Sequence, residues 1–241
     1  MTYSLLISDL HLDPARPEHL AALETLLDNH AGKADRLYVL GDLFEAWIGD
    51  DDDSPFNRQA IDAFRRFSDA GSELFFMHGN RDFMLGDDFA AACGGTLLDE
   101  GTVVDLYGTH ALLMHGDSLC TDDLEYMRMR RWLRNPASRL LLRNLPKRTR
   151  YKLGRKLRDE SQNRTRMKAA EITDVNLGAV AHIMREKGVK TLIHGHTHRP
   201  AIHDLMIDGK PAQRIVLGDW DQAGWALEVD ENGKRLEAFA L

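Results

Sequence analysis

The feature that most constrains the fold of this chain is a series of short apolar runs, each closed by glycine or a polar residue. Runs of this kind, bounded by turn signals, are typical of buried strands. Helical patterns over 18–30, 57–70 and 83–93 separate the first four of them. Strands that alternate with helices predict an α/β sheet. The predicted strands are 3–8, 37–40, 74–77, 111–114 and 191–193, followed by closing strands at 215–217, 225–229 and 236–239.

Polar side chains come directly after most of these predicted strands. Sites in α/β sheets form at the carboxyl ends of strands, so we expect these side chains to converge. They comprise two carboxylates, one amide oxygen and four imidazoles, a mixed set that suits Mn, Fe, Co or Zn and not Ca. Seven ligands are too many for one catalytic ion, but they suit two ions about 3.5–4 Å apart that share a carboxylate, as is common in phosphate-ester hydrolysis. The candidate ligands are Asp9, His11, Asp42, Asn80, His115, His196 and His198.

One interval between strand ends is much longer than the others, and it contains a basic segment. The strand ends from Asp9 to His115 follow one another at intervals of 33 to 38 residues, whereas His196 comes 81 residues after His115. Residues 128–168, within this gap, hold sixteen Lys and Arg against two acids, a formal charge of +14 in a chain whose net charge is −7. A split this large marks a functional surface. We therefore predict a core formed by 1–120 and 169–241, and a basic amphipathic helical insertion, the lid, at 121–168.

The lid also carries apolar residues interleaved with its bases, and several functions fit this pattern. Basic amphipathic helices bind anionic membrane surfaces, and they could also wall an acyl-chain pocket. A solvated helical hairpin packed on the core is the plainer alternative. Nucleic-acid binding would use the same charge, but aromatic stacking platforms are scarce here, so we expect no nucleic-acid partner. The apolar residues are Trp132, Leu133, Leu140, Leu141, Leu142, Leu145, Leu153 and Leu157.

Each ligand motif is weak alone, but the five in order resemble the calcineurin-like metallophosphoesterase superfamily. The shared pattern is Asp-x-His, Gly-Asp, Gly-Asn-x-Asp, His and Gly-His-x-His. The resemblance implies a two-sheet sandwich flanked by helices. It implies that Asp42 bridges the two ions and that a hydroxide between them is the nucleophile. One ion would be held by Asp9, His11, Asp42 and His198, the other by Asp42, Asn80, His115 and His196.

Arg81 departs from the superfamily pattern, in which a histidine usually follows the asparagine and is often assigned as the general acid. Arginine stays protonated and is a poor proton donor, but it clamps phosphate oxygens well. A phosphate leaving group needs no acid, so Arg81 favours a phosphoanhydride substrate over a simple ester. The alternative is that Arg81 only pairs with Asp82.

Longer segments resemble one family within this superfamily, the UDP-2,3-diacylglucosamine diphosphatases of bacterial lipid A biosynthesis. They are 44–51, 78–83, 114–123, 174–176 and 192–200, together with the lid. The resemblance implies hydrolysis of UDP-2,3-diacylglucosamine to UMP and 2,3-diacylglucosamine 1-phosphate, with water attacking the α-phosphorus. It implies manganese as the usual ion and a peripheral place on the cytoplasmic face of the inner membrane. Catalytic roles would fall on Asp42, Arg81 and His196, and substrate contacts on Asn80, Arg81, Asp123, Ser161, Thr165, Lys168 and His196.

Two other functions remain open, a soluble metallophosphoesterase acting on a nucleotide or phosphoprotein, and a basic binding module with an inactive site. Two cysteines, Cys93 and Cys120, are too few for a disulfide framework, and we expect both to be buried. No apolar run approaches the ~18 residues of a membrane span, and no obligate protein partner is evident. His194 either supports the site or bonds to the backbone, and the acidic run 50–53 is expected to be a solvated loop.

Overall fold

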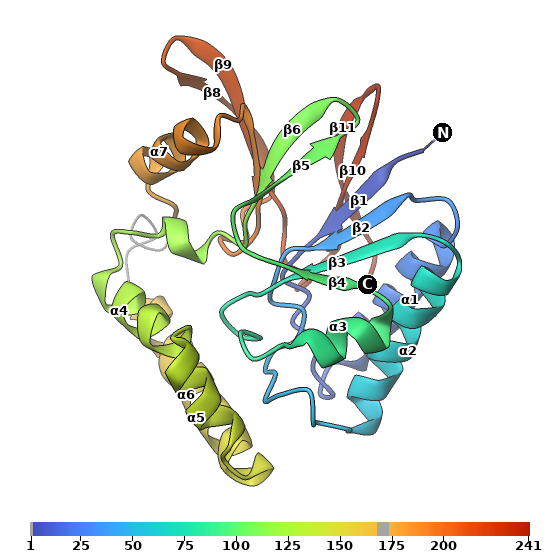
Figure 1. Cartoon of the computed structure of the whole chain (residues 1–241), viewed down its shortest axis with the longest axis vertical. Coiled ribbons are helices and arrows are strands. Elements are labelled where there is room, and N and C mark those ends of the chain that lie inside the picture. The colour runs from blue at the N-terminus through green and yellow to red at the C-terminus, as the bar shows by residue number, and fades with distance from the viewer. Residues whose placement is uncertain (1, 168–173) are drawn as a thin grey trace.

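The computed structural model describes residues 2–167 and 174–241, with side chains described up to Leu157 in the first range. Two sheets pack face to face, and helices cover both outer faces (Figure 1). This confirms the predicted α/β sandwich of two sheets flanked by helices. The first sheet has the order β11-β10-β1-β2-β3-β4 and the second has the order β5-β6-β7-β9-β8.

The first sheet contains the parallel strands that carry half of the predicted site. Alternate residues of β1 point to opposite faces: Leu5 and Ile7 pack with the helices, and Leu6 packs between the sheets. The strands are β1 (Ser4–Ile7), β2 (Arg36–Val39), β3 (Glu73–Met77), β4 (Thr96–Leu98), β10 (Gly224–Asp230) and β11 (Gly233–Phe239). The covering helices are α1 (Pro17–His30), α2 (Pro55–Asp69) and α3 (Asp87–Cys93).

The second sheet carries three of the four predicted histidine ligands, His115, His196 and His198, and helix α7 (Leu177–Lys187) packs on its outer face (Figure 1). Its parallel pairs are β6 with β7 and β7 with β9. The ends of β6 and β7 therefore lie at the same edge of the sheet. The strands are β5 (Thr102–Leu106), β6 (Thr109–Leu113), β7 (Thr191–His194), β8 (Ala201–Ile207) and β9 (Lys210–Val216).

Three strands were not predicted from the sequence, and all three lie at sheet edges. They are β4, β5 and β8. An edge strand is half exposed, so polar residues can interrupt its apolar run; in β8, for example, His203 and Asp204 stand between Ile202 and Leu205. Strand β9 also begins five residues earlier than predicted, because β8 and β9 form a hairpin through Asp208 and Gly209.

The acidic run 50–53 is a loop with Asp51 and Asp53 exposed, as predicted, but it also makes specific contacts. Asp50 caps α3, because its Oδ1 accepts from the Gly86 amide at 2.9 Å and its Oδ2 from the Phe89 amide at 3.1 Å. This cap explains why α3 begins at Asp87 and not at 83. Asp51 pairs with the guanidinium of Arg150, which is buried. The run therefore ties the core to the lid.

Helices fill the inserted segment between the two halves of the core and project beside the end of the first sheet (Figure 1). They follow the short helix η1 (Asp117–Leu119) and are α4 (Leu124–Leu133), α5 (Pro136–Arg143) and α6 (Lys147–Met167). Leu133 and Leu142 are buried against the first-sheet core, whereas Trp132, Leu140 and Leu141 are exposed. No helix of the described residues is both long and apolar enough to cross a bilayer. The boundaries of core and lid stay a prediction.

Candidate active site

The predicted ligands lie at the carboxyl ends of strands in both sheets, on loops that hydrogen-bond to one another. The amide of Asp9, after β1, donates to Gly41 O at 3.0 Å, and the amide of His11 donates to Asp42 O at 3.0 Å. The amide of His196, after β7, donates to Asp9 Oδ2 at 2.8 Å. These bonds join three loops, from both sheets, into one site.

The first cluster consists of Asp9, His11 and His198, whose ligand atoms lie within 4.8 Å of one another. His198 Nε2 is 3.4 Å from Asp9 Oδ1 and 3.4 Å from His11 Nε2. Asp9 Oδ1 is buried and has no hydrogen-bond partner among the described residues. A buried carboxylate oxygen without a donor is costly, and a bound cation would satisfy it.

Two carboxylates turn these imidazoles toward the same point. Glu45 Oε2 lies 3.1 Å from His11 Nδ1, and Asp219 Oδ2 lies 3.1 Å from His198 Nδ1. When the proton of each imidazole is on Nδ1, beside its carboxylate, the Nε2 lone pairs face Asp9 Oδ1. Lone pairs that meet without a proton repel one another unless a cation lies among them. Such carboxylate–histidine pairs are the usual support of metal ligands.

The second cluster consists of Asp42, His115 and His196, again with ligand atoms within 4.8 Å of one another. Asn80 joins it, because its Oδ1 lies 3.1 Å from His115 Nε2. His115 Nδ1–H donates to Leu40 O at 2.9 Å, which directs Nε2 into the site. The structure therefore brings all seven predicted ligands together in two groups. That Asp42 also serves the first group stays a prediction.

The backbone at the site is strained. Non-glycine residues with positive φ are uncommon and cost about 1–3 kcal/mol each when the surrounding structure holds them there. Among the described residues seven have this conformation, and Tyr107 and Asp208 occupy hairpin turns. The other five are predicted ligands: Asp9, His11, Asp42, His196 and His198, with φ between 48° and 67°. Strain concentrated at these five positions indicates that their side-chain directions are functional.

Two glycines let the loops approach the ligands closely. A Cβ on Gly79 would lie 2.0 Å from Asp42 Oδ1, and a Cβ on Gly195 would lie 2.2 Å from Asp9 Oδ2. Both distances are far below any real contact of a Cβ atom. Glycine is therefore required at both positions for the ligand carboxylates to keep their places.

The charges of the site favour a bound cation. Burial raises the pKa of Asp9, but His198 and the other nearby histidines outweigh it and hold that pKa well below its usual range. Burial lowers the pKa of His198, but Asp219 and Asp9 outweigh it and raise it to about 10. Burial and the neighbouring His115 lower the pKa of His196 to about 4, so its imidazole stays neutral and able to ligate. Together with the oxygen and nitrogen donors, these features fit divalent metal ions.

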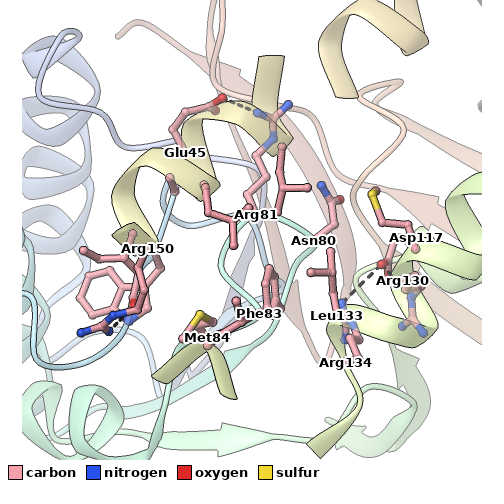
Figure 2. Close-up of a pocket in the computed structure, with 18 of the residues that line it drawn as sticks. Glu45, Asn80, Arg81, Phe83, Met84, Asp117, Arg130, Leu133, Arg134 and Arg150 are labelled. Atoms are coloured by element: carbon pink, nitrogen blue, oxygen red, sulfur yellow. Dashed lines mark hydrogen bonds and ion pairs between the residues drawn. The ribbon is translucent and has the colours of Figure 1, made fainter. Parts of the chain in front are cut away.

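Arg81 does not pair with Asp82, so that alternative is wrong. Its guanidinium contacts Glu45 (Figure 2), and its Nε lies 3.6 Å from Asp42 Oδ2. Asp82 instead accepts from the amides of Leu43 and Gly79, both at 2.7 Å. Arg81 is thus held at the edge of the metal clusters with its charge directed toward them.

A pocket opens from the site and runs between the core and the lid helices (Figure 2). The space between its lining residues, open solvent included, is about 920 Å³. Asn80 and Arg81 line it beside the metal clusters. Charged side chains, among them Asp117, Arg130 and Arg150, line part of the rest. Apolar side chains from both the core and the lid line the remainder: Trp47, Ile48, Phe83, Met84, Met129, Leu133, Leu142, Leu153 and Leu157.

Of the other predicted substrate contacts, only Asp123 has a side chain among the described residues. Asp123 caps α4, accepting from the Tyr126 amide at 3.1 Å, and the Tyr126 ring lies 6.1 Å from the His196 ring. Ser161 and Thr165 fall on α6, where their side chains are outside the described residues, as is the whole of Lys168. His194 is buried and donates to Gly195 O at 2.8 Å, which agrees with the backbone alternative.

Sequence reasoning missed Glu45, Asp219 and a buried group around Asp117. Asp219 follows Gly218 after a predicted strand, the same signal that marked Asp42, so it could have been found. Asp117 follows Gly116 just beyond the predicted strand 111–114 and shows the same signal. Glu45 carries no local signal, because its role depends on contacts with Arg81 and His11.

Known proteins match this chain over nearly its whole length. The sequence pattern of the family described as calcineurin-like phosphoesterase matches residues 4–200. A UDP-2,3-diacylglucosamine hydrolase of Pseudomonas fluorescens (strain Pf0-1) is 60% identical over 235 residues, which cover 98% of this chain and 95% of that protein. A protein of the same name from Pseudomonas entomophila (strain L48) is 58% identical, with 98% of both chains covered.

Among solved structures, a novel archaeal phosphodiesterase superposes with a TM-score of 0.53 at 12% identity, covering 99% of each chain. At that identity the likeness shows a shared fold alone. The family match and the two Pseudomonas relatives agree with the ligand clusters in the structure. The chain therefore belongs to the calcineurin-like phosphoesterase family and, within it, to the family of the UDP-2,3-diacylglucosamine hydrolases.

Proposed function

We propose that this protein hydrolyses the pyrophosphate bond of UDP-2,3-diacylglucosamine, giving UMP and 2,3-diacylglucosamine 1-phosphate in lipid A biosynthesis. One structural observation supports this substrate independently of the relatives' names. The metal-ligand clusters and the apolar pocket are continuous through Asn80, which belongs to both, and Arg81, which lines the pocket and lies 3.6 Å from Asp42. A substrate that carries both a charged diphosphate and apolar acyl chains would contact the clusters and the pocket at the same time. A soluble nucleotide or phosphoprotein would leave the apolar walls empty.

The residues where the ligand clusters meet the pocket have different roles in the proposed reaction. Arg81 directs a fixed positive charge toward the clusters and presents planar donors that match phosphate oxygens. Glu45 contacts that guanidinium and limits its freedom. The lipid phosphate leaves as a stable anion, so the chain needs no proton donor at the position of Arg81. His196, kept neutral by burial, is free to ligate.

The two ligand clusters would hold two divalent ions, which we propose to be Mn²⁺. When bound, such ions activate a water molecule and neutralise charge on phosphoryl oxygens. We propose that water attacks the α-phosphorus, on the UMP side. The strained loops fix the ligand carboxylates and imidazoles before substrate arrives, so little reorganisation is needed during the reaction.

The acyl chains would occupy the apolar pocket between core and lid. Burying an acyl chain contributes about 0.8 kcal/mol per CH₂, so a few ordered methylenes would dominate binding. Asp123, Ser161, Thr165 and Lys168 are the proposed contacts to the polar parts of the substrate. The role of Asp123 is supported by its position as the cap of α4, the helix whose Tyr126 lies beside His196.

We also propose that the protein attaches peripherally to the cytoplasmic face of the inner membrane through the lid. Trp132 and Leu141 are 53% and 62% exposed, and bases such as Arg143 and Arg148 are exposed on the same group of helices. Each base near an anionic surface contributes about 1 kcal/mol and is weakened by salt. Sedimentation with phosphatidylglycerol vesicles, which falls as salt rises, is the expected result. Equal sedimentation with neutral vesicles would contradict this attachment.

The activity is tested by comparing three substrates under one set of conditions. UDP-2,3-diacylglucosamine carries the diphosphate and both chains, UDP-N-acetylglucosamine carries the diphosphate without long chains, and bis(p-nitrophenyl) phosphate is a generic diester. We expect kcat/KM to be highest for the diacyl substrate by at least about 100-fold, as burial of a few methylenes implies. Removing metal with a chelator should abolish turnover of all three, and Mn²⁺ should restore it. Equal kcat/KM for the acylated and unacylated sugar nucleotides would contradict the proposed substrate.

A further inference from the structure

A buried cluster of charged side chains lies beside the site but belongs to neither ligand group. It consists of Glu100, Asp117, Arg130 and Arg134, two acids against two bases. Asp117 is fully buried, and Glu100 is 13% exposed at its side chain. Arg130 and Arg134 come from the lid helix α4, and the acids come from the second-sheet half of the core. The cluster therefore joins the lid to the core by charge as well as by packing.

Asp117 Oδ2 is the centre of the cluster. It accepts from the Tyr126 hydroxyl at 2.6 Å, from Arg130 Nε at 2.8 Å and from Arg134 Nη2 at 3.4 Å. Glu100 contacts Arg130 as well, and its Oε2 lies 3.8 Å from Arg134 Nη1. A buried ion-pair group costs desolvation that apolar packing would avoid, so a cluster of this size calls for a reason beyond stability.

The contacts of Arg134 supply that reason, because its guanidinium also reaches the loop that carries Asn80 and Arg81. Its Nη2 donates to Gly79 O at 3.1 Å and to His78 O at 3.4 Å. The next two residues are Asn80 and Arg81. In Figure 2, Asp117, Arg130 and Arg134 lie on the side of the pocket next to Asn80.

The same loop is held from its other side by the core. Asp82 Oδ1 accepts from the Gly79 amide at 2.7 Å, and the Arg81 amide donates to Asp42 Oδ1 at 2.8 Å. The loop thus has its amides fixed by core carboxylates and its carbonyls fixed by Arg134 of the lid. Movement of α4 would be transmitted to Asn80 and Arg81 directly.

We infer that Arg134 is a positioning residue. Asp117 and Glu100 hold its guanidinium, and through it the position of the lid helix α4 on the core determines the positions of Asn80 and Arg81. The inference rests on the proposed function, since it takes Asn80 as a metal ligand and Arg81 as a phosphate clamp. A ligand displaced by a few tenths of an ångström leaves the range of a metal bond, and a misplacement of about 1 Å can cost 10²-fold in rate. Loss of the Arg134 contacts should therefore weaken one metal site and slow turnover of any substrate.

The test compares Arg134→Lys with the matched control Arg128→Lys, which makes the same change at an exposed position of the same helix. Lysine keeps the charge and can satisfy Asp117, but it lacks the fork that reaches Gly79 O at the same time. Arg134→Gln is the harsher variant. Urea unfolding establishes that each variant is folded under the assay conditions, and if Arg134→Gln is not, Arg134→Lys decides.

Two measurements separate positioning from simple support of the fold. The first is Mn²⁺ binding by calorimetry, where Arg134→Lys should weaken one of the two binding steps by about tenfold while Arg128→Lys matches the wild type. The second is kcat on bis(p-nitrophenyl) phosphate, which does not use the acyl pocket, and which should fall by about tenfold or more. If folded Arg134→Lys binds both ions and turns over the diester like Arg128→Lys, the inference is wrong. If the wild type itself neither binds two ions nor hydrolyses the diacyl substrate, the proposed function has failed instead.

Discussion

Replacing Gly195 by alanine tests whether the place of Asp9 is set by backbone packing. A Cβ at this position would lie 2.2 Å from Asp9 Oδ2 and 2.2 Å from Ser8 Oγ, both on fully buried residues. Contacts of a Cβ below 3.0 Å are essentially never seen. The Asp9 carboxylate must therefore withdraw by about 0.8 Å at least, since the interior around it is close-packed and cannot absorb the clash elsewhere.

The required shift is larger than a metal site tolerates. Ligand distances vary by only about 0.2 Å around their usual values, so a displacement of about 0.8 Å breaks the bond from Asp9 to its ion. Overpacking of this kind costs about 1–3 kcal/mol of stability, which leaves an ordinary domain folded. Gly195→Ala should thus give a folded protein with one metal site lost and turnover lowered by about 100-fold.

Metal content after gel filtration, by mass spectrometry, and kcat on the diacyl substrate are the readouts. Gly188→Ala is the control, because Gly188 ends α7 with φ 66° and a Cβ there meets nothing within 4 Å. Gly188→Ala forces alanine into a positive φ but causes no steric clash. The variant should therefore lose stability but keep both ions and full turnover. Two bound ions and near-wild-type turnover in Gly195→Ala would refute the argument from packing.

Three further outcomes are expected. Asp42→Ala should remove both ions and lower turnover more than Asn80→Ala, which should affect one ion first; metal content and kcat check this, and two ions retained in Asp42→Ala would contradict the bridging role. Leu142→Ser should raise KM for the diacyl substrate by about tenfold, because Leu142 lines the pocket and burying a leucine is worth about 1.5–3 kcal/mol, whereas Leu141→Ser should leave KM unchanged and weaken vesicle binding. Burial raises the pKa of the Cys120 thiol to about 12, so thiolate is scarce at pH 8 and native protein should resist iodoacetamide that modifies the unfolded chain; rapid native labelling would show that the site opens.

The sequence predicted the buried strands and the ligands because both signals are local. A fully buried parallel strand is a continuous apolar run, and each ligand follows such a run at the edge where the strand ends. The edge strands β4, β5 and β8 were missed because exposure on one side breaks the run. The start of α3 was misplaced because the residue that caps it, Asp50, is distant in sequence.

Orientation within the lid also depended on the tertiary structure. Leu141 and Leu142 are adjacent and chemically identical, yet one is exposed and the other is buried in the pocket wall. Composition identifies an amphipathic helix but not which face meets the core, because the bases of the lid surround both leucines. For the same reason no local pattern pointed to Arg134, whose partners lie on three separate segments of the core.

The central claim is that the metal clusters direct water to the α-phosphorus of a diacylated sugar nucleotide. Hydrolysis of UDP-2,3-diacylglucosamine in ¹⁸O-labelled water, followed by mass spectrometry of both products, tests it most directly. The account predicts one labelled oxygen in UMP and none in 2,3-diacylglucosamine 1-phosphate. Label in the lipid phosphate would reverse the assignment of attacked and leaving groups, and absence of both products would contradict the proposed activity.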